Sequence, residues 1–179
     1  MRVRSQAGFT LIEVIVVAAI LAILAGILVP IIFNQIDEAK IARAVSDAKS
    51  INTAILVFRK DTGQWPDKAG NCTTNASFLN GEGSLPTNLA AFGFDTEASG
   101  RFTDMLEIDD NGCWPNTWKG PYLKTVTADP WGNAYFVNAN NFNLDGGAVS
   151  VYSAGPNGIL DSFAGAFATG GDDIAVRVK

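Results

Sequence analysis

The sequence predicts an α+β protein in which a long N-terminal helix packs on a small C-terminal antiparallel β-sheet. Three observations predict this fold class. Residues 14–33 are all apolar, Gly or Pro, residues 34–59 carry apolar residues at spacings of three and four, and the last third of the chain contains short alternating segments between turn residues. A chain of 179 residues is long enough for one modest domain plus such an extended helix.

The composition limits the functions that the chain can have. It contains no His, which removes the commonest general base and the commonest transition-metal ligand and excludes Ser or Cys triads that depend on His. The formal net charge is −5, so no broad basic surface for nucleic acid is expected and no specific nucleic-acid partner is predicted.

The apolar run is long enough to cross a membrane, because its twenty residues span about 30 Å as a helix. Arg2 and Arg4 precede it, and the positive-inside rule places this end in the cytoplasm and the remainder of the chain across the membrane. A cleaved secretory signal and a simple single-pass anchor are the alternatives. The run is long for a signal core and continues into an amphipathic helix, and a simple anchor does not account for the acidic residue at its start.

That acidic residue is Glu13, which lies at the membrane edge of an otherwise apolar helix. A carboxylate in this position costs on the order of 3 kcal/mol unless it is paired. The neighbouring sequence offers no cation beyond Arg2 and Arg4, so a positive charge from another molecule would remove the cost. The alternative is a Glu side chain that snorkels to the interface.

The segment Gly8-Phe9-Thr10-Leu11-Ile12-Glu13 resembles the class III signal of type IV pilins and type II secretion pseudopilins. The resemblance implies that a prepilin peptidase cleaves between Gly8 and Phe9 and that the new N-terminus of Phe9 is methylated. The α-amine of Phe9 in one subunit would then neutralise the Glu13 carboxylate of the next. The divisions expected from this are a leader peptide at 1–8, a hydrophobic transmembrane and assembly helix at 9–33, and a periplasmic or extracellular globular pilin domain at 34–179.

Pro30 lies inside the apolar run, where it has no N–H to donate to the carbonyl of Gly26. A local kink or loosening of the helix is expected there, and a simple bend with no role is the alternative. Pilin relatives also carry a proline in this part of the helix. The resemblance therefore implies a flexible point that unwinds when subunits pack into a filament.

The second half of the helix is amphipathic and needs a globular body to cover one face. Charged residues fill much of the other faces, and Gly63 and Pro66 are expected to end the helix. The apolar face consists of Val45, Ala48, Ile51, Ile55 and Phe58.

Residues 67–121 show no sustained period and are expected to form a long connecting region with one short helix near 85–92. Cys72 and Cys113 lie in this region. If it lies outside the cytoplasm, a disulfide between them is expected, and closing that loop would stabilise the fold by roughly 4 kcal/mol in the chain-entropy model. Two buried free thiols are the alternative.

Three strands are expected after this region, joined by short loops that favour an antiparallel sheet. The first follows Asp129-Pro130-Trp131-Gly132, a strong turn sequence. The sheet should pack on the amphipathic half of the helix. The expected strands are 133–137, 148–152 and 174–178.

Several segments of the last third of the chain resemble the major pseudopilins of type II secretion. They are 120–124, 129–133, 152–158 and 171–174. Together with the N-terminal signal, the resemblance covers roughly the first sixty and the last sixty residues, and the region 67–119 has no clear counterpart.

In the resembling pseudopilins the loop before the last strand binds calcium, so the resemblance implies a calcium site here. Calcium takes six to eight oxygen ligands, which a flexible loop can supply from carboxylates, amides and backbone carbonyls. The alternative is a turn-rich loop whose Asp and Asn side chains cap the backbone. The candidate ligands are Ser153, the carbonyl of Ala154, Asn157, Asp161, Asp172 and Asp173.

The resemblance implies a structural subunit that polymerises through its apolar helix and is not an enzyme. Its expected partners are further copies of itself, a prepilin peptidase, an inner-membrane assembly platform, minor pseudopilins or pilins, and the membrane before assembly. The expected location is the bacterial inner membrane with a periplasmic domain, and then a periplasmic or extracellular filament.

Two filament roles compete. The calcium-like loop favours the major pseudopilin of a type II protein secretion system. The segment 67–119 favours the major pilin of a type IV pilus that serves adhesion, motility or DNA uptake.

Two other functional classes have less support. A membrane-tethered enzyme would use the acidic residues of the middle region, but nothing positions a nucleophile or base among them, and a solvated acidic face is expected. A sugar-binding module would use Trp114 and Trp118, which are expected instead to pack beneath the long loop. The acidic residues are Asp104, Glu107, Asp109 and Asp110.

Overall fold

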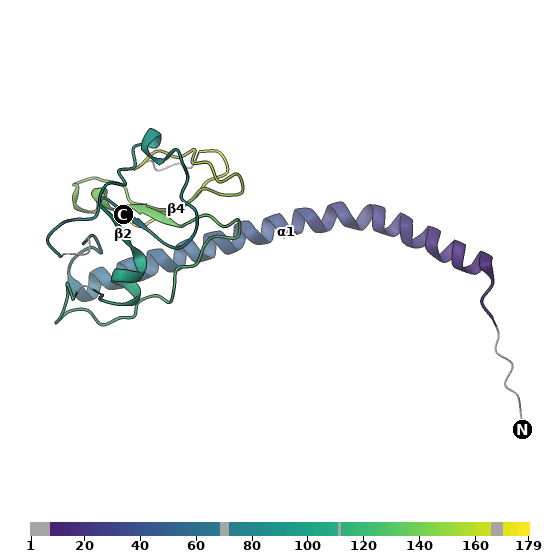
Figure 1. Cartoon of the computed structure of the whole chain (residues 1–179), viewed down its shortest axis with the longest axis horizontal. Coiled ribbons are helices and arrows are strands. Elements are labelled where there is room, and N and C mark those ends of the chain that lie inside the picture. Colours follow the sequence, from purple (N-terminus) through teal and green to yellow (C-terminus); the bar gives the residue numbers. More distant parts are fainter. Residues whose placement is uncertain (1–7, 69–71, 111, 166–169) are drawn as a thin grey trace, which may run out of the picture. The chain divides into compact units, whose positions relative to one another are not determined.

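The computed structural model describes residues 8–68, 72–110, 112–165 and 170–179 and divides into two units, 1–40 and 41–179. One α-helix, α1, runs from Leu11 to Thr62 through both units (Figure 1). The elements that follow are β1 (Phe78–Asn80), the 3₁₀ helix η1 (Leu89–Phe92), β2 (Ser99–Arg101), the π-helical turn η2 (Thr103–Glu107), β3 (Phe136–Asn138), the 3₁₀ helix η3 (Ala139–Asn143), β4 (Ser150–Ser153) and β5 (Ile174–Arg177). The α+β class is confirmed.

The sheet has five strands in the order β2-β1-β3-β4-β5. Its last three strands pair antiparallel, as predicted, and their bounds lie within three residues of the expected ones. The sheet as a whole is mixed, however, because β2 runs parallel to β1. The purely antiparallel sheet of the prediction is therefore corrected by one parallel edge pair.

Strands β1 and β2 come from the region that was expected to hold only a connection and a short helix. They were missed because each has three residues, too few to show a period of two, and β2 has the sequence Ser-Gly-Arg. The short helix expected near 85–92 is present as η1.

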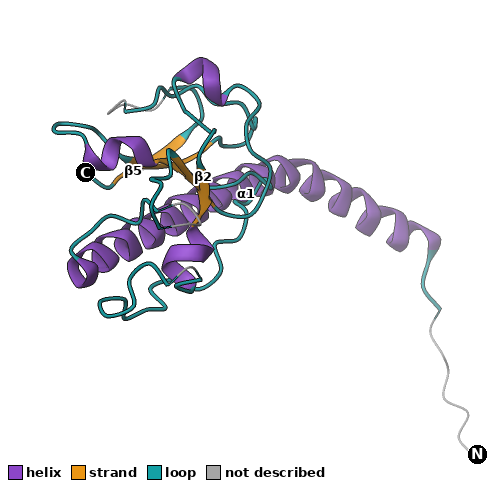
Figure 2. Cartoon of the chain, turned by 60° about the vertical axis from the view of Figure 1, so that its left-hand side comes forward, coloured by secondary structure: helices purple, strands orange, loops and turns teal. Residues whose placement is uncertain are grey.

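The amphipathic half of α1 packs on one face of this sheet (Figure 2). Leu79, Val137 and Val151 share one buried cluster with Ile51, Ile55 and Phe58 of the helix. The expected apolar face is confirmed except at Val45, which is half-buried, while Ala44 is fully buried beside it. Ala44, Ala48 and Ala54 are small, so the helix can approach the sheet closely.

The opposite face of the sheet is also covered. This explains why nearly all residues of β1, β3 and β4 are buried, on whichever face their side chains lie. Phe78, Phe136 and Tyr152 form a second cluster with residues of the connecting region and of the loop before β5. Phe94 meets Phe78, Phe136 and Tyr152 edge to face at ring-centroid distances of 6.3, 5.3 and 5.3 Å. The long connection therefore has a structural role as the second layer over the sheet.

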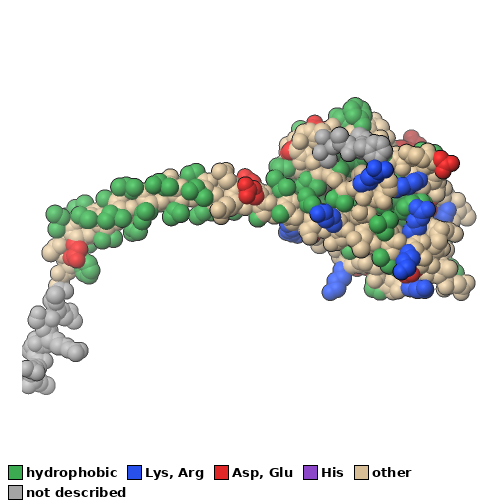
Figure 3. Space-filling model, turned by 180° about the vertical axis from the view of Figure 1, so that it is seen from behind, with side chains coloured by type: hydrophobic (Ala, Val, Ile, Leu, Met, Phe, Trp, Pro, Cys, Tyr) green, Lys and Arg blue, Asp and Glu red, His purple; other side chains and the backbone are tan. Residues whose placement is uncertain are grey.

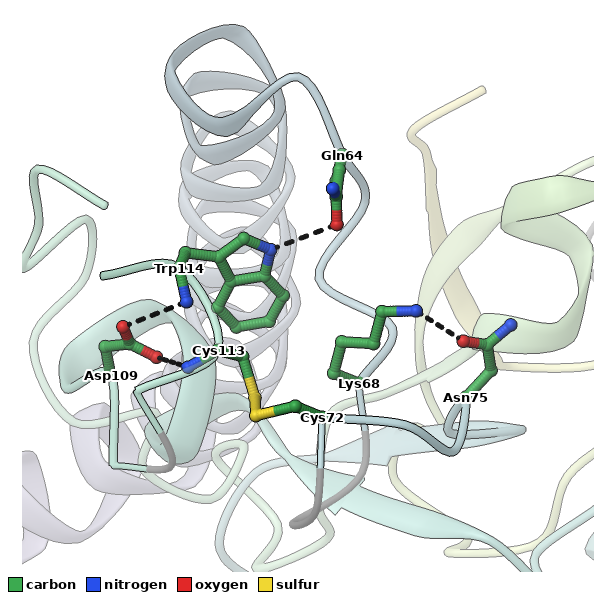
Figure 4. Close-up of a disulfide and its surroundings, with 7 residues drawn as sticks. All are labelled: Gln64, Lys68, Cys72, Asn75, Asp109, Cys113 and Trp114. Carbon is green, nitrogen blue, oxygen red and sulfur yellow. Dashed lines mark hydrogen bonds between the residues drawn. A yellow bond between two sulfur atoms is a disulfide. The ribbon is translucent and has the colours of Figure 1, made fainter. Parts of the chain in front are cut away.

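Cys72 and Cys113 form a disulfide that joins two parts of the connecting region, as predicted. Trp114, the residue after Cys113, has only 4% of its surface exposed, and its ring meets that of Phe58 edge to face at 4.8 Å. The Asp109 carboxylate accepts hydrogen bonds from the backbone N–H groups of Cys113 and Trp114 at 2.9 and 3.2 Å (Figure 4). The disulfide therefore closes a segment that is also packed on α1.

Candidate functional site

The first candidate site is the N-terminal part of α1. Hydrophobic side chains cover this part of the helix (Figure 3), and its apolar window has none of its residues buried within the chain. Among the described residues, α1 is the one helix whose length and composition would let it cross a membrane. This surface is of the kind that lipid or other helices cover.

Glu13 lies in the first turn of α1 beside exposed apolar side chains. Its nearest polar neighbour is the hydroxyl of Thr10, which lies 3.5 Å from its carboxylate and donates a long hydrogen bond. Phe9 is 81% exposed one turn before it, and the two residues line a shallow hollow together with Val14 and Val17. Glu13 has no salt bridge among the described residues, so its negative charge is available to another molecule.

Gly8 has open space around it. A Cβ added there would meet no atom within 4 Å, so packing in this structure does not require glycine at this position. A requirement for glycine would then come from recognition by another protein.

Helix α1 continues through Pro30 without a break. Gly26, whose carbonyl lacks a donor from Pro30, also has open space around its α-carbon. A flexible point that unwinds on assembly stays a prediction.

The second candidate site is the loop between β4 and β5, where Asp161, Asp172 and Asp173 come together. The backbone N–H of Asp161 donates to Asp173 Oδ2 at 2.8 Å. The side chain of Asp161 also lies so close to Gly171 that an added Cβ there would collide with it. The three predicted acidic residues therefore share one place in the fold.

Two carboxylate oxygens at this place are buried without a hydrogen-bond partner among the described residues, namely Asp172 Oδ1 and Asp173 Oδ1. Burial raises the pKa of the Asp173 carboxyl above its ordinary value, and the neighbouring charge of Asp161 adds to this, while hydrogen bonds from Ser162 and from the Asp161 backbone act in the opposite direction. Burial of such oxygens without a partner is costly, and it marks this loop as a candidate site.

The remaining candidates are used differently. The hydroxyl of Ser153 donates a hydrogen bond to Asp129 Oδ2 at 2.6 Å. It therefore contacts the turn that begins at Asp129. Asn157 Oδ1 accepts a hydrogen bond from the N–H of Ile159 at 2.6 Å, which is the turn-capping role of the alternative interpretation. Ala154 is fully buried at the end of β4.

Within the described residues, no group of three or more Asp, Glu, His or Cys side chains is arranged to hold a metal ion. A cation in this loop would therefore need backbone carbonyl or amide oxygens in addition to the carboxylates. Sequence reasoning missed Ser162, whose buried hydroxyl accepts from the N–H of Gly170 at 3.0 Å and helps to fix the loop.

Two of the four acidic residues of the middle region make hydrogen bonds within the fold. Asp109 holds the backbone of Cys113 and Trp114, and Glu107 Oε1 accepts a hydrogen bond from Thr125 at 3.1 Å. Trp114 is buried, which leaves it unavailable as a platform for a sugar.

Comparison with known proteins identifies the family of this chain. Residues 3–29 match the family model of the prokaryotic N-terminal methylation motif, and residues 84–164 match that of type II secretion system (T2SS), protein G. The type II secretion system core protein G of Pseudomonas aeruginosa is 31% identical over 159 residues, which cover 88% of this chain and 89% of that protein. This chain belongs to the type II secretion system protein G family.

The protein G of Escherichia coli K12 is 30% identical over 154 residues, which cover 86% of this chain and 83% of that protein. The protein G match begins at residue 84, so it includes residues 84–119 of the region that had no apparent counterpart in the sequence. Of the two filament roles, these relatives favour the major pseudopilin of type II secretion over the major pilin of a type IV pilus.

Proposed function

We propose that this chain is a structural subunit that is anchored in the inner membrane by residues 9–33 and polymerises into the filament of a type II secretion system. A prepilin peptidase would cleave between Gly8 and Phe9 and methylate the new N-terminus. The methylation motif at residues 3–29 and the protein G relatives support this proposal. The function would depend on assembly and not on catalysis.

One observation carries the proposal, namely an exposed Glu13 carboxylate in the first turn of an apolar helix. In lipid such a group costs about 3 kcal/mol unless it is paired. The α-amine of Phe9 of a neighbouring copy supplies the charge, so that pairing is available only in the assembled filament. Further copies, minor pseudopilins and an inner-membrane assembly platform are the expected partners, and the domain from residue 34 onward would lie in the periplasm.

Replacing Glu13 with Gln tests the proposal. The variant should still insert into the inner membrane. Its filament yield should fall by at least about ten-fold, because the interchain ion pair is lost. Filaments sheared from cells that also express the secretion apparatus would be quantified, and mass spectrometry would give the N-terminus of the subunit. Asp37→Asn, which removes an exposed carboxylate farther along the same helix, is the matched control and should assemble normally.

Assembly of Glu13→Gln at the parental level would refute the proposed ion pair. A mature chain that begins at any residue other than Phe9 would refute the proposed processing. Long extracellular fibres made of this chain would show a surface pilus instead of a periplasmic filament.

We also propose that the loop between β4 and β5 binds calcium. The buried oxygens Asp172 Oδ1 and Asp173 Oδ1, which have no partner among the described residues, favour this second function. Asp172 and Asp173 would contribute carboxylate oxygens, and backbone oxygens of the loop would complete the coordination. Calcium would fix the loop as one unit beside β5.

Calcium should raise the thermal midpoint of the chain in non-ionic detergent by about 5–10 °C at a concentration 100 times its dissociation constant. Asp173→Asn should abolish this rise. In EDTA at neutral pH the variant should be no less stable than the parent. The pKa of Asp173 is raised in the folded state, so its ionised form destabilises the fold at pH values above the ordinary carboxyl pKa, and Asn carries no such charge.

Asp145→Asn, which changes an exposed carboxylate outside this loop, should keep the full response. An unchanged midpoint of the parent at millimolar calcium would contradict the calcium proposal and leave the filament proposal intact.

A further inference from the structure

Three Asn-Gly pairs occur in the chain, at 80–81, 111–112 and 157–158. In such a pair the backbone nitrogen of Gly can attack the side-chain amide carbon of Asn, because Gly has no Cβ to hinder ring closure. The nitrogen loses its proton, ammonia leaves with it, and a five-membered succinimide forms. Water then opens the ring to Asp or isoaspartate, so the net change is the exchange of ammonia for water. Asn111 lies outside the described residues, and the other two pairs can be compared.

The amide of Asn157 is accessible and activated. Asn157 is exposed, and its Nδ2 donates no hydrogen bond within the described part of the chain. Its Oδ1 accepts a hydrogen bond from the N–H of Ile159 at 2.6 Å. This oxygen is the atom on which negative charge develops when the amide carbon is attacked. The Ile159 N–H therefore stabilises the transition state of ring closure.

The attacking nitrogen of Gly158 is weakly held. Its N–H donates to the carbonyl of Gly155 at 3.4 Å. That distance is longer than the usual range of about 2.7–3.2 Å for such a bond. Gly158 lies in a turn, outside the paired strands, with a left-handed φ of 67°. The nitrogen can therefore be released without breaking the sheet.

The pair Asn80-Gly81 is protected by the sheet. Asn80 is the last residue of β1, which pairs with β2 on one side and β3 on the other. The N–H of Gly81 donates to the carbonyl of Tyr135 at 2.8 Å, and Nδ2 of Asn80 donates to the carbonyl of Gly81 at 2.9 Å. Attack by this nitrogen requires local opening of the sheet.

We propose that Asn157 is a deamidation site of the folded chain, whereas Asn80 is protected. The new carboxylate would lie beside Asp172, whose Oδ2 accepts a hydrogen bond from the Asn157 N–H at 3.1 Å. Each event adds one negative charge, so the formal net charge of −5 would become −6. The loop between β4 and β5 would thus become more acidic with time, in a reaction whose only co-reactant is water.

The test compares the two pairs within one molecule. The full chain in non-ionic detergent and EDTA is kept at physiological temperature and mildly alkaline pH in water enriched in ¹⁸O. This label distinguishes products of the incubation from those of later digestion, and peptide mass spectrometry gives both rates. Asn157 should react at least about ten-fold faster than Asn80, because the Gly81 nitrogen must first leave the sheet. In urea the two rates should become similar.

Two Gly variants test the route. Gly158→Asn keeps a residue that tolerates the left-handed conformation and adds a side chain that hinders ring closure, so deamidation of Asn157 should slow by at least about ten-fold. Gly112→Asn is the matched control. Gly112 is also left-handed, with a φ of 60° and open space around it. This variant should leave the rate at Asn157 unchanged.

Equal rates at Asn157 and Asn80 in the folded chain would overturn the proposal. So would an Asn157 that reacts only after unfolding in urea, which needs no variant to be observed. A parental rate at Asn157 in Gly158→Asn would contradict attack by the Gly158 nitrogen.

One consequence rests on the calcium site proposed above. Asn157→Asp, which has the sequence of one product, should show the calcium-induced rise in thermal midpoint at lower calcium concentrations than the parent, because it adds a carboxylate to the loop. A parental response of this variant would refute the consequence. A parent without any calcium response would refute the calcium site, whereas the deamidation rates are measured in EDTA and do not depend on it.

Discussion

Glu13 and Asp173 are both carboxylates in unfavourable surroundings, but for different reasons. Glu13 is exposed on an apolar helix, so its charge becomes costly only when lipid covers that helix. Asp173 is 7% exposed in a folded loop, where burial and the charge of Asp161 raise its pKa. In the proposals above, Glu13 is paired by another subunit and Asp173 by a cation, because lipid surrounds the first carboxylate and folded protein surrounds the second.

Tyr135 offers a prediction at the same scale. Its ring is buried and its hydroxyl donates to Asp47 Oδ2 at 3.4 Å, and burial together with the charges of Asp47 and Asp129 raises its pKa above the ordinary value. The folded state therefore resists ionisation of this phenol. Its contribution to stability is fully present below pH 10.0, the ordinary value, and is lost as the pH rises above it.

Tyr135→Phe should cost about 1 kcal/mol or less at neutral pH, because the lost hydrogen bond is long. Above about pH 10 the variant should lose up to about 1.4 kcal/mol less stability per pH unit than the parent. Urea unfolding of the full chain in non-ionic detergent from about pH 8 to about pH 10.5 would measure both values. An identical pH dependence of the two proteins would contradict the assigned role of burial.

At the scale of the element, α1 is one helix with two different surfaces. From Leu11 to Ala39 none of its side chains is buried, whereas from Ala44 to Phe58 a continuous stripe is buried against the sheet. The same period of 3.6 residues runs through both parts, so the difference lies in what covers each surface. The charged residues of the second half mark the stripe in the sequence, because they leave one apolar face.

Ile55 and Leu56 are neighbours on this helix and give a matched test. Ile55 is 0% exposed and Leu56 is 44% exposed. Ile55→Ala should lower the free energy of unfolding by about 2–5 kcal/mol, because it opens a cavity between helix and sheet, while Leu56→Ala should change it by less than about 1 kcal/mol. Urea unfolding followed by near-ultraviolet circular dichroism would compare the two, and equal losses would contradict the assigned helix face.

At the scale of the whole molecule, the buried core belongs to the unit formed by residues 41–179. The buried residues of the two core clusters all lie between Ala48 and Leu160 in the sequence. Ala175 and Val176 of β5 are partly buried and pack against these clusters. The disulfide lies within the same unit. Nothing in the first unit contributes a buried side chain among its described residues. The folded core therefore depends on the second unit, and the proposed assembly would use the first.

A fragment of residues 34–179 should fold without the apolar segment and remain monomeric. Its thermal midpoint should lie within a few degrees of that of the full chain in detergent, since no buried residue is lost. A fragment that begins at Ser50 lacks Ala44 and Ala48 and should be clearly less stable. Calorimetry and sedimentation would measure both, and an unfolded or oligomeric 34–179 fragment would contradict this division.

The sequence by itself determined the long helix, its apolar and amphipathic halves, the last three strands and the pairing of the two cysteines. Each of these leaves a local trace, such as an unbroken apolar run, spacings of three and four, an alternation, or a count of two thiols. The methylation motif was also visible in the sequence, through the resemblance of the segment around Gly8, Phe9 and Glu13 to a class III signal.

Only the tertiary structure decided the rest. Strands β1 and β2 exist because the sheet supplies their partners, since three residues carry no pattern of their own. The packing of Phe94 against Tyr152, and that of Trp114 against Phe58, depends on a connecting region that folds back over the sheet and onto α1. Such contacts join residues far apart in the chain. A local sequence pattern does not specify which distant segment will pack against it.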